Sequence, residues 1–255
     1  MLASERHARI VEMLRDSRVV STDDFSHALK VSTETIRRDL VTLDSLGLLE
    51  RVHGGASITM SPSAGEEAPF AERSAKQNSA KTRMGIAAAA LVSQGQTIVI
   101  DVGTTAVSVA RAIPMDFSGT VATSSLLVAA ELADRPHLDV LVSGGKLRAG
   151  DLALSNSLTD AFFADLYPDI AFLGSGGLDD IAGLTDYYLD EATARKTIVK
   201  NATRSFVLAD STKFGRVARH RVVALRDLAG LITDQMPPAG IAEAVSVDGG
   251  IVIVS

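Results

Sequence analysis

The first 45 residues carry three stretches in which apolar residues recur every three or four positions. That spacing places the apolar side chains on one face of an α-helix. It predicts helices over Glu5–Arg15, from Ser21 to Leu29 and from Ser32 onward, and serine is a favoured residue at helix N-termini. The inward stripes of the three helices are Ile10, Val11 and Leu14; Phe25, Ala28 and Leu29; and Ile36, Leu40 and Leu43.

The third predicted helix has a polar face that carries arginines. Arg38 points away from the apolar stripe and Arg37 lies at its flank, so both could reach phosphates or guanine edges. A short turn at Val31–Ser32 joins the second helix to the third, as in a helix-turn-helix. Leu48–Ala56 then alternates toward a glycine turn, as a small β-wing does. The sequence therefore predicts a winged helix-turn-helix, although two arginines on an amphipathic helix also occur on ordinary protein surfaces.

From Lys81 onward, short apolar stretches alternate with stretches of helical spacing. Aromatic residues make up 4% of the chain and tryptophan is absent, so aliphatic residues and alanine must form the core. This composition and alternation predict a doubly wound, mostly parallel α/β sheet. The expected strands are 97–100, 119–122, 138–142, 170–173, 205–208, 231–233 and 251–254, and the expected helices are 84–91, 104–113, 126–133, 158–164 and 191–203.

The 255 residues have room for one small and one larger domain. Ser61–Pro69 lacks periodicity and is rich in turn formers, which is typical of a linker. We therefore predict a DNA-binding domain over residues 1–58, a linker over 59–75 and an α/β domain over 76–255.

Composition and charge narrow the classes of function. The absence of cysteine excludes disulfides, cysteine zinc sites and thiol nucleophiles. No stretch resembles a signal peptide or a membrane span, which predicts a soluble, cytoplasmic protein without a membrane partner. The net charge is −6, and residues 1–56 hold eight Lys/Arg against nine Asp/Glu. DNA binding must therefore depend on a local patch of Arg37, Arg38 and Arg51 and on paired half-sites.

Polar residues and glycines follow several of the predicted strands. Asp101–Thr105 opens a helix directly after a strand, so backbone amides and two hydroxyls meet the positive end of a helix dipole, where an anion fits. Asp210–Gly215 follows another strand and adds Lys213, which could pair with phosphate or lie exposed in a loop. Glu191 could bind hydroxyls or cap its helix. The other polar strand ends are Thr123–Ser125, Ser143–Lys146 and Gly174–Gly177, each of which alone could be an ordinary turn.

The first 56 residues carry a specific signature, namely Val31-Ser32, Thr35–Leu40, Leu43, Gly47–Leu49 and Arg51–Ala56. With it, residues 4–56 resemble the DNA-binding half of the DeoR-type bacterial transcriptional regulators. The resemblance implies operator binding through Thr35, Arg37 and Arg38, with the wing near the DNA backbone. Asp39 is expected to pair with a neighbouring arginine, because phosphates would repel it. The predicted DNA-binding residues are Ser32, Thr33, Thr35, Arg37, Arg38, Arg51 and His53.

A second set of matches comprises the Asp101–Thr105 loop, Gly144-Gly145, Gly183–Thr185 and Asp210–Gly215. With these, residues 70–235 resemble the effector-sensing domain of DeoR-type regulators, which is similar to sugar-phosphate isomerases of the ribose-phosphate type. The resemblance implies a sensor for a phosphorylated sugar or a related metabolite. We expect no cofactor and no metal. The predicted effector-binding residues are Asp101, Gly103, Thr104, Thr105, Thr123, Ser124, Ser125, Gly144, Gly145, Gly176, Glu191 and Lys213.

Two kinds of function stay open at this stage. One is a regulator, expected to be a repressor of a carbohydrate-metabolism operon that a phosphorylated sugar releases from operator DNA. An activator, which would differ only in the position of its operator, stays open beside the repressor. The other is an isomerase-like enzyme with a DNA-binding appendage, in which Asp101, Glu191 and Lys213 would supply charged groups. The reader domain favours regulation, so we expect no enzyme and no catalytic residues. An effector can alter DNA affinity only by favouring one arrangement of paired readers, which implies a homo-oligomer, either a dimer or a tetramer.

Overall fold

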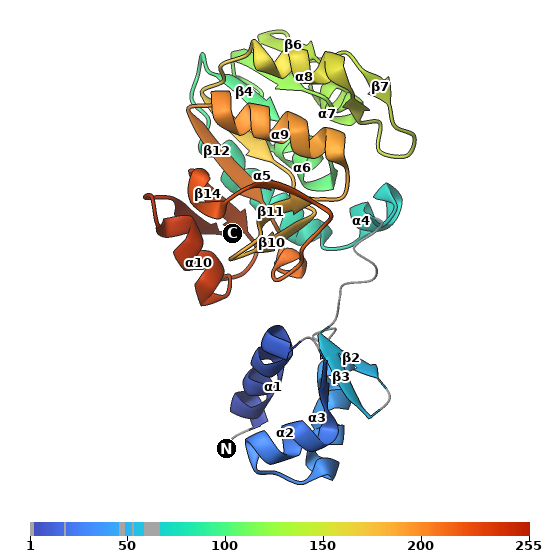
Figure 1. The fold of residues 1–255 in the computed structure, drawn as a ribbon. Coiled ribbons are helices and arrows are strands. Elements are labelled where there is room, and N and C mark those ends of the chain that lie inside the picture. The colour runs from blue at the N-terminus through green and yellow to red at the C-terminus, as the bar shows by residue number, and fades with distance from the viewer. Residues whose placement is uncertain (1–2, 18, 46–48, 53, 59–66) are drawn as a thin grey trace. The chain divides into compact units, whose positions relative to one another are not determined.

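In the computed structural model the chain divides into two compact units, residues 1–64 and 65–255 (Figure 1). The structure describes residues 3–17, 19–45, 49–52, 54–58 and 67–255. The range predicted as a linker, 59–75, straddles this division: residues 59–66 lie outside the described residues, and Phe70–Ala75 form helix α4. Three residues named in the sequence predictions, Gly47, Leu48 and His53, also lie outside the described residues.

The first unit is a winged helix-turn-helix, as predicted. Its helices enclose a core of Ile10, Leu14, Phe25, Ile36 and Leu40, all at most 2% exposed. Ala28, predicted to face inward, is exposed, because the turn of helix that carries it presents Leu29 to the core instead. The elements are α1 (Ala3–Ser17), β1 (Val19–Ser21), α2 (Thr22–Leu29), α3 (Thr33–Ser45), β2 (Leu49–Val52) and β3 (Gly55–Ile58), with the strands in the antiparallel order β1-β3-β2.

Serine caps begin the second and third helices at the predicted places. The Ser21 Oγ atom accepts a hydrogen bond from the Asp24 backbone N–H at 3.1 Å. The Ser32 Oγ atom accepts one from the Thr35 backbone N–H at 3.2 Å. Between the helices, Lys30 adopts a left-handed conformation with φ +54° and ends α2. The turn of the helix-turn-helix is therefore fixed by local chemistry at both of its ends.

The second unit contains a seven-stranded sheet in which every pairing is parallel. All seven strands fall where the alternating sequence pattern predicts them, so the doubly wound fold class is confirmed. The strand order is β15-β14-β12-β9-β4-β5-β6. The strands are β4 (Thr97–Ile100), β5 (Gly119–Thr123), β6 (Leu138–Val142), β9 (Ile170–Leu173), β12 (Arg204–Leu208), β14 (Gly230–Thr233) and β15 (Ile251–Val254).

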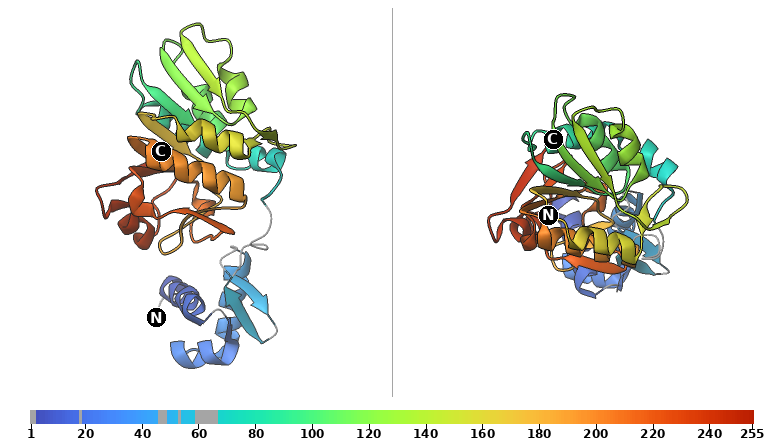
Figure 2. Two further views of the ribbon diagram at one scale, coloured as in Figure 1. Left: turned by 45° about the horizontal axis from the view of Figure 1, so that its top comes forward. Right: turned by 90° about the horizontal axis from the view of Figure 1, so that it is seen from above.

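Helices cover both faces of this sheet (Figures 1 and 2). Ile98 and Ile100 of β4 pack in one core with residues of α5, α6 and α7, such as Met84. Val99 faces the opposite way and packs with residues of α8, α9 and α10, such as Phe163 and Ile198. Successive strand residues therefore fill two separate cores. The helices are α5 (Asn78–Ala89), α6 (Thr104–Ala112), α7 (Leu126–Leu132), α8 (Ser157–Ala164), α9 (Leu189–Asn201) and α10 (Ala239–Ser246).

Several smaller elements were not predicted from the sequence. A three-stranded antiparallel sheet joins β10, β11 and β13, and a two-stranded hairpin pairs β7 with β8. No helix among the described residues is long and apolar enough to cross a membrane. The elements are β7 (Lys146–Leu147), β8 (Leu154–Ser155), β10 (Gly177–Asp179), β11 (Gly183–Asp186), β13 (His220–Val223), and the 3-10 turns η1 (Ser211–Lys213) and η2 (Leu225–Asp227).

The strand order reverses between β4 and β9. From β4 the chain adds β5 and β6 on one side, and from β9 it adds β12, β14 and β15 on the other. The loops that leave β4 and β9 lie next to each other, because the Asp101 Oδ2 atom accepts a hydrogen bond from the Gly174 backbone N–H at 2.8 Å. Open α/β sheets bind their ligands in the crevice at such a reversal.

Candidate functional site

Helix α3 is held in place by an ionic contact with α1. Arg6 donates to both carboxylate oxygens of Asp39, at 2.5 and 3.0 Å, and His7 lies 2.9 Å from one of them. Burial alone would raise the pKa of Asp39, but hydrogen bonds from Arg6 and His7 outweigh it and lower the pKa. Asp39 thus pairs with an arginine, as expected, although the partner lies 33 positions away in the chain and not on the same helix. This contact orients the polar face of α3.

The two arginines of α3 that are predicted to bind DNA are solvent-exposed. The side chains of Arg37 and Arg38 are 65% and 80% exposed, and Glu34 lies 4.0 and 3.5 Å from their guanidinium groups. Thr35 and Ser32 face each other across the helix start, with their hydroxyl oxygens 2.8 Å apart. Thr33 is half-buried at the first position of the helix, and Arg51 of the wing is exposed. His53 lies outside the described residues.

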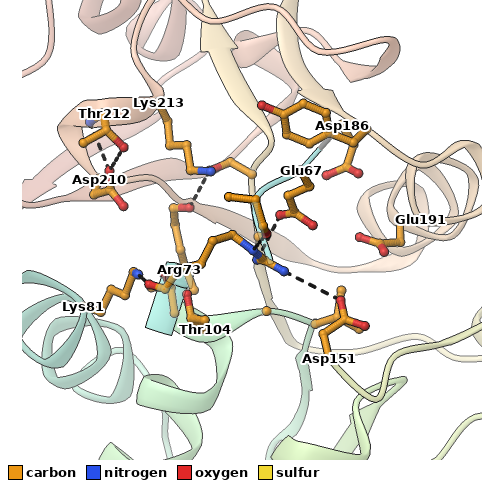
Figure 3. A pocket seen from close by; sticks show the side chains of 18 of the residues that line it. Glu67, Arg73, Lys81, Thr104, Asp151, Asp186, Glu191, Asp210, Thr212 and Lys213 are labelled. Atoms are coloured by element: carbon orange, nitrogen blue, oxygen red, sulfur yellow. Dashed lines mark hydrogen bonds and ion pairs between the residues drawn. The ribbon is translucent and has the colours of Figure 1, made fainter. Parts of the chain in front are cut away.

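A cavity of about 380 Å³ lies at the strand reversal of the second unit (Figure 3). The loop after β4 and the N-terminus of α6 contribute Gly103, Thr104 and Thr105 to its lining, α9 contributes Glu191 and the turn after β12 contributes Lys213. The structure therefore brings these five predicted residues together around one space. Within the described residues no group of three or more histidine, aspartate or glutamate side chains could hold a metal ion.

The other predicted effector residues hold the surrounding loops. Asp101 lies behind the cavity wall, where it accepts hydrogen bonds from Gly174 and Arg195. Ser125 is fully buried and caps α7, and the Thr123 hydroxyl accepts a hydrogen bond from the Ser125 backbone. The side-chain oxygens of Asp101, Thr123 and Ser125 thus have partners inside the fold, and their role in binding the effector stays a prediction. As far as the described residues form the lining, it leaves out Asp101, Thr123, Ser124, Ser125, Gly144, Gly145 and Gly176.

The cavity floor is an arginine surrounded by carboxylates. Arg195 of α9 is 3% exposed in its side chain and donates to Asp101 at 2.5 Å, to Asp186, and to Glu191 at 3.2 Å. Burial lowers the pKa of Arg195, but the carboxylates of Asp101, Asp186 and Glu191 outweigh that effect and raise it. This guanidinium therefore stays charged and fixes Asp186 and Glu191 in the wall of the cavity and Asp101 behind it.

A second arginine extends the ionic network toward the cavity rim. Arg148, in the hairpin after β7, contacts both Asp151 and Glu191, and its guanidinium carbon lies 3.9 Å from the centre of the Tyr188 ring. Burial raises the pKa of Glu191 to about 7, against the opposing effect of Arg195. The Glu191 carboxyl group is consequently partly protonated near neutral pH, while the arginines beside it remain cations.

Lysines complete the cationic side of the cavity. Burial lowers the pKa of Lys213, against the opposing effect of Asp210 and Glu67. Burial also lowers the pKa of Lys81, whose Nζ atom donates to backbone carbonyl groups of the segment around α4. A bound anion would favour the charged form of both lysines and so oppose the effect of burial on their pKa values.

The sequence analysis missed Arg73, Arg148 and Arg195. The sequence analysis selected polar residues that directly follow predicted strands, and none of these three arginines does so. One signal was available for Arg195: it lies four positions after Glu191 and three before Ile198, so a charged pair shares the buried face of a helix. A buried arginine on an apolar stripe indicates a paired acid, but the sequence does not say which one.

A DNA-reading domain followed by a domain with a ligand-sized cavity defines a transcriptional regulator. Residues 6–61 match the family described as "DeoR-like helix-turn-helix domain", and residues 76–235 match the "DeoR C terminal sensor domain". The chain belongs to the DeoR family. It is 30% identical to the glycerol-3-phosphate regulon repressor of Escherichia coli over 96% of both chains. It is 34% identical to the HTH-type transcriptional regulator GlpR of Haloferax volcanii, over 99% of this chain and 98% of the relative.

Solved structures with similar folds are more remote. Ribose 5-phosphate isomerase A from Methanocaldococcus jannaschii is 17% identical, covers 55% of each chain and superposes with a TM-score of 0.41. The full-length sorbitol operon regulator SorC from Klebsiella pneumoniae is 11% identical, covers 90% of this chain and 95% of its own, and has a TM-score of 0.41. At these scores neither similarity carries an inference about function.

Proposed function

We propose that this chain represses a carbohydrate-metabolism operon and leaves its operator when a phosphorylated sugar or polyol binds the cavity of the second unit. The observation that carries the proposal is the charge of the cavity. Among the described residues that line it, seven are cationic and five are carboxylates. The excess of two positive charges suits a phosphate monoester, which carries about −1.5 to −2 at pH 7.

The two sides of the cavity suit the two parts of such a ligand. Gly103, Thr104 and Thr105 at the start of α6 offer backbone amides and hydroxyls, and Lys213 adds a cation, which together form an anion site. The opposite side presents Asp186 and Glu191, fixed by arginines, and carboxylates accept hydrogen bonds from hydroxyl groups. A phosphorylated polyol has both kinds of group. Curated relatives named as repressors of the glycerol-3-phosphate regulon and of an aga operon support this class of ligand.

Release of DNA requires that the ligand favour one state of the regulator over another. Because a ligand shifts an equilibrium only by its difference in affinity for the two states, the effector must bind more weakly to the operator-bound protein. The reader domain has few cations, so specific binding needs two readers on paired half-sites. We therefore propose a homo-oligomer as the DNA-binding form.

The test is an operator-release titration on the full chain. DNase footprinting of the DNA upstream of its own coding region identifies the operator, and fluorescence anisotropy then follows its release by sugar and polyol phosphates and by their unphosphorylated forms. We expect release by a phosphorylated compound, and loss of that response, with operator binding retained, in Thr104→Ala, Thr105→Ala and Lys213→Ala. Lys196→Ala, an exposed lysine on α9 outside the cavity lining, is the matched control and should respond normally. Equal release by both forms of the compounds contradicts phosphate recognition.

An isomerase-like activity is the second candidate, and one observation favours it: the pKa of Glu191, raised by burial to about 7, suits a general base. Against it, Glu191 contacts the guanidinium groups of both Arg148 and Arg195. A turnover assay with aldose and ketose phosphates separates the candidates. Interconversion above the uncatalysed rate would support an enzyme, and its absence alongside binding supports a sensor.

A further inference from the structure

The segment Glu67–Lys76, which leads into the second unit, forms part of the cavity wall. It contributes Glu67, Ala68, Arg73 and Lys76 to the lining, although it precedes the first strand of the sheet. The segment is arranged around the guanidinium group of Arg73. That group contacts Glu67 through Nη1 at 2.9 Å, donates through Nε to the Ala68 carbonyl at 2.9 Å and lies 3.7 Å from Asp151 through Nη2 (Figure 3). One side chain inside the cavity thus holds both Glu67 and Ala68, the two residues at the start of the segment.

The backbone of Arg73 is anchored independently of its guanidinium group. The Arg73 N–H donates to the Pro69 carbonyl at 3.0 Å within α4. The Lys81 Nζ atom donates to the carbonyl of Arg73 and, at 2.8 Å, to that of Lys76. These bonds hold the end of α4 against α5. The guanidinium group can therefore exchange one anionic partner for another while the helix that carries it stays in place.

Arg73 also lies beside the anion site at the start of α6. A Cβ atom built on Gly103 would be 3.8 Å from Arg73 Nη1, which is the same nitrogen that contacts Glu67. Glu67 and Lys213 are close enough for each to shift the titration of the other. The Glu67 carboxylate thus lies near Arg73 and near Lys213, the cation that the proposed function assigns to the effector phosphate. Its side chain is 14% exposed, so it occupies this position at a desolvation cost.

From this geometry we infer that the Glu67 carboxylate occupies the effector's anion site in the unliganded protein, and that the effector phosphate replaces Glu67 as the anionic partner of Arg73. The contact between Arg73 Nη1 and Glu67 breaks, and Arg73 instead donates to a phosphate oxygen, which is an equivalent charge-assisted partner. Glu67 then leaves the cavity. This inference rests on the proposed function and adds its regulation: Glu67 is an internal competitor of the effector.

The position of Glu67 in the chain gives the exchange a consequence. Strand β3 of the first unit ends at Ile58, and residues 59–66 connect it to Glu67. Residues 67–69 are held to the cavity through Glu67 and through the Ala68 carbonyl, both bound to Arg73. Displacing the carboxylate removes one of these two attachments, next to the point where the connection to the reader begins. Effector binding thereby changes the constraint on the chain that carries the DNA-binding domain.

The test compares Glu67→Gln with Glu72→Gln in the full chain. Both substitutions remove one negative charge from the same segment, but the Glu72 side chain is 50% exposed and pairs with Lys76. Calorimetry measures the affinity for inorganic phosphate, glycerol 3-phosphate and a panel of sugar phosphates. A binding-competent state populated at about 10% lowers apparent affinity about tenfold, so E67Q should bind the effector about tenfold tighter. E72Q should stay within about twofold of the wild type.

A double variant ties the gain to the guanidinium group. If Glu67 competes for Arg73, the gain from E67Q disappears in the Arg73→Gln background, as a double-mutant cycle detects. Hydrogen exchange at the amides of residues 67–73 should quicken in unliganded E67Q and, in the wild type, on adding the effector. If E67Q binds a phosphorylated compound no more tightly than the wild type, Glu67 supports Arg73 instead of competing for it, and this inference is overturned while the sensor function stands. If neither protein binds any phosphorylated compound, the proposed function is overturned as well.

Discussion

Replacing Arg195 with methionine should destabilise the second unit far more than a substitution on its surface does. Methionine fills a similar volume without the charge. The structure shows three carboxylates around this guanidinium group, with side-chain exposures of 5% for Asp101, 6% for Asp186 and 9% for Glu191. Removing one partner of a buried ion pair leaves an uncompensated charge, which is the costly part of the change.

The size of the effect follows from what each carboxylate keeps. Asp101 keeps the Gly174 N–H, Asp186 keeps the Tyr188 N–H at 3.1 Å, and Glu191 keeps Arg148. Two carboxylates therefore lose their charged partner. A hydrogen bond to a charged group contributes about 1.5–3 kcal/mol, and removing one member of a buried pair costs about 3–5 kcal/mol. We expect R195M to lower the free energy of unfolding by about 3–5 kcal/mol at pH 8.

Tyrosine fluorescence during urea unfolding of the full chain measures this effect. The three tyrosines, Tyr167, Tyr187 and Tyr188, all belong to the second unit, and the chain has no tryptophan. With a slope of about 2 kcal/mol per molar urea, the midpoint should fall by about 1.5–2.5 M. Arg226→Met, at an exposed position, should change stability by at most about 0.5 kcal/mol. A loss below about 1 kcal/mol for R195M would refute the buried network.

Three further predictions concern pH and DNA. Burial raises the pKa of Glu191 to about 7, so the folded protein retains a proton that the unfolded chain releases above its pKa of about 4.3. The wild type therefore loses stability as the pH rises between these two values. In the same urea assay, the free energy of unfolding of Glu191→Gln should accordingly rise relative to that of the wild type from pH 5 to 8. A constant difference would contradict this. Asp39→Asn should cost about 1.5–3 kcal/mol at pH 7, measured by hydrogen exchange of α1 and α3. The pKa of Asp39 is lowered in the folded state, so Asp39 contributes to the free energy of unfolding above its unfolded pKa of about 3.9. This contribution is lost as the pH falls through the folded pKa. If Asp39→Asn costs as much stability at pH 3 as at pH 7, the result argues against the Arg6 contact. Arg37→Ala or Arg38→Ala should weaken operator binding by about 1–3 kcal/mol if the side chain reads a base, whereas a phosphate contact would lower affinity for all sequences and reduce the salt slope by about one unit. Unchanged binding in both variants excludes α3 as the reader.

The sequence predicts the second unit's main sheet well because its strands are short apolar runs between helices. Strands β4, β9 and β15 begin and end at the predicted residues. β10 and β11 escape prediction, because three- and four-residue strands that start with glycine show no alternation. Helix α10 was also missed, since its eight residues follow a proline-rich turn and carry one short apolar stripe.

Some residues of the candidate site could be predicted from the sequence and others could not. Residues that follow strands, such as Thr104 and Lys213, were predictable, because parallel strands bring their carboxyl ends to one edge. Arg73 and Arg148 were not, since they reach the cavity from a helix before the sheet and from a hairpin beyond it. Asp101 was predicted to bind the ligand, but its carboxylate is bound by Arg195, 94 positions away. Long-range pairings of this kind carry no local signal in a single sequence.

One cavity of this regulator is proposed to recognise the phosphate group of a small metabolite. The most direct measurement is calorimetric titration of the full chain with phosphorylated and unphosphorylated forms of the same polyols and sugars, repeated on Lys213→Ala. We predict that one phosphorylated compound binds at least about a hundredfold more tightly than its unphosphorylated form, and that Lys213→Ala removes most of this preference, because a charge-assisted contact contributes about 1.5–3 kcal/mol. Equal affinities for the two forms, or a preference that Lys213→Ala leaves unchanged, would contradict phosphate recognition in this cavity.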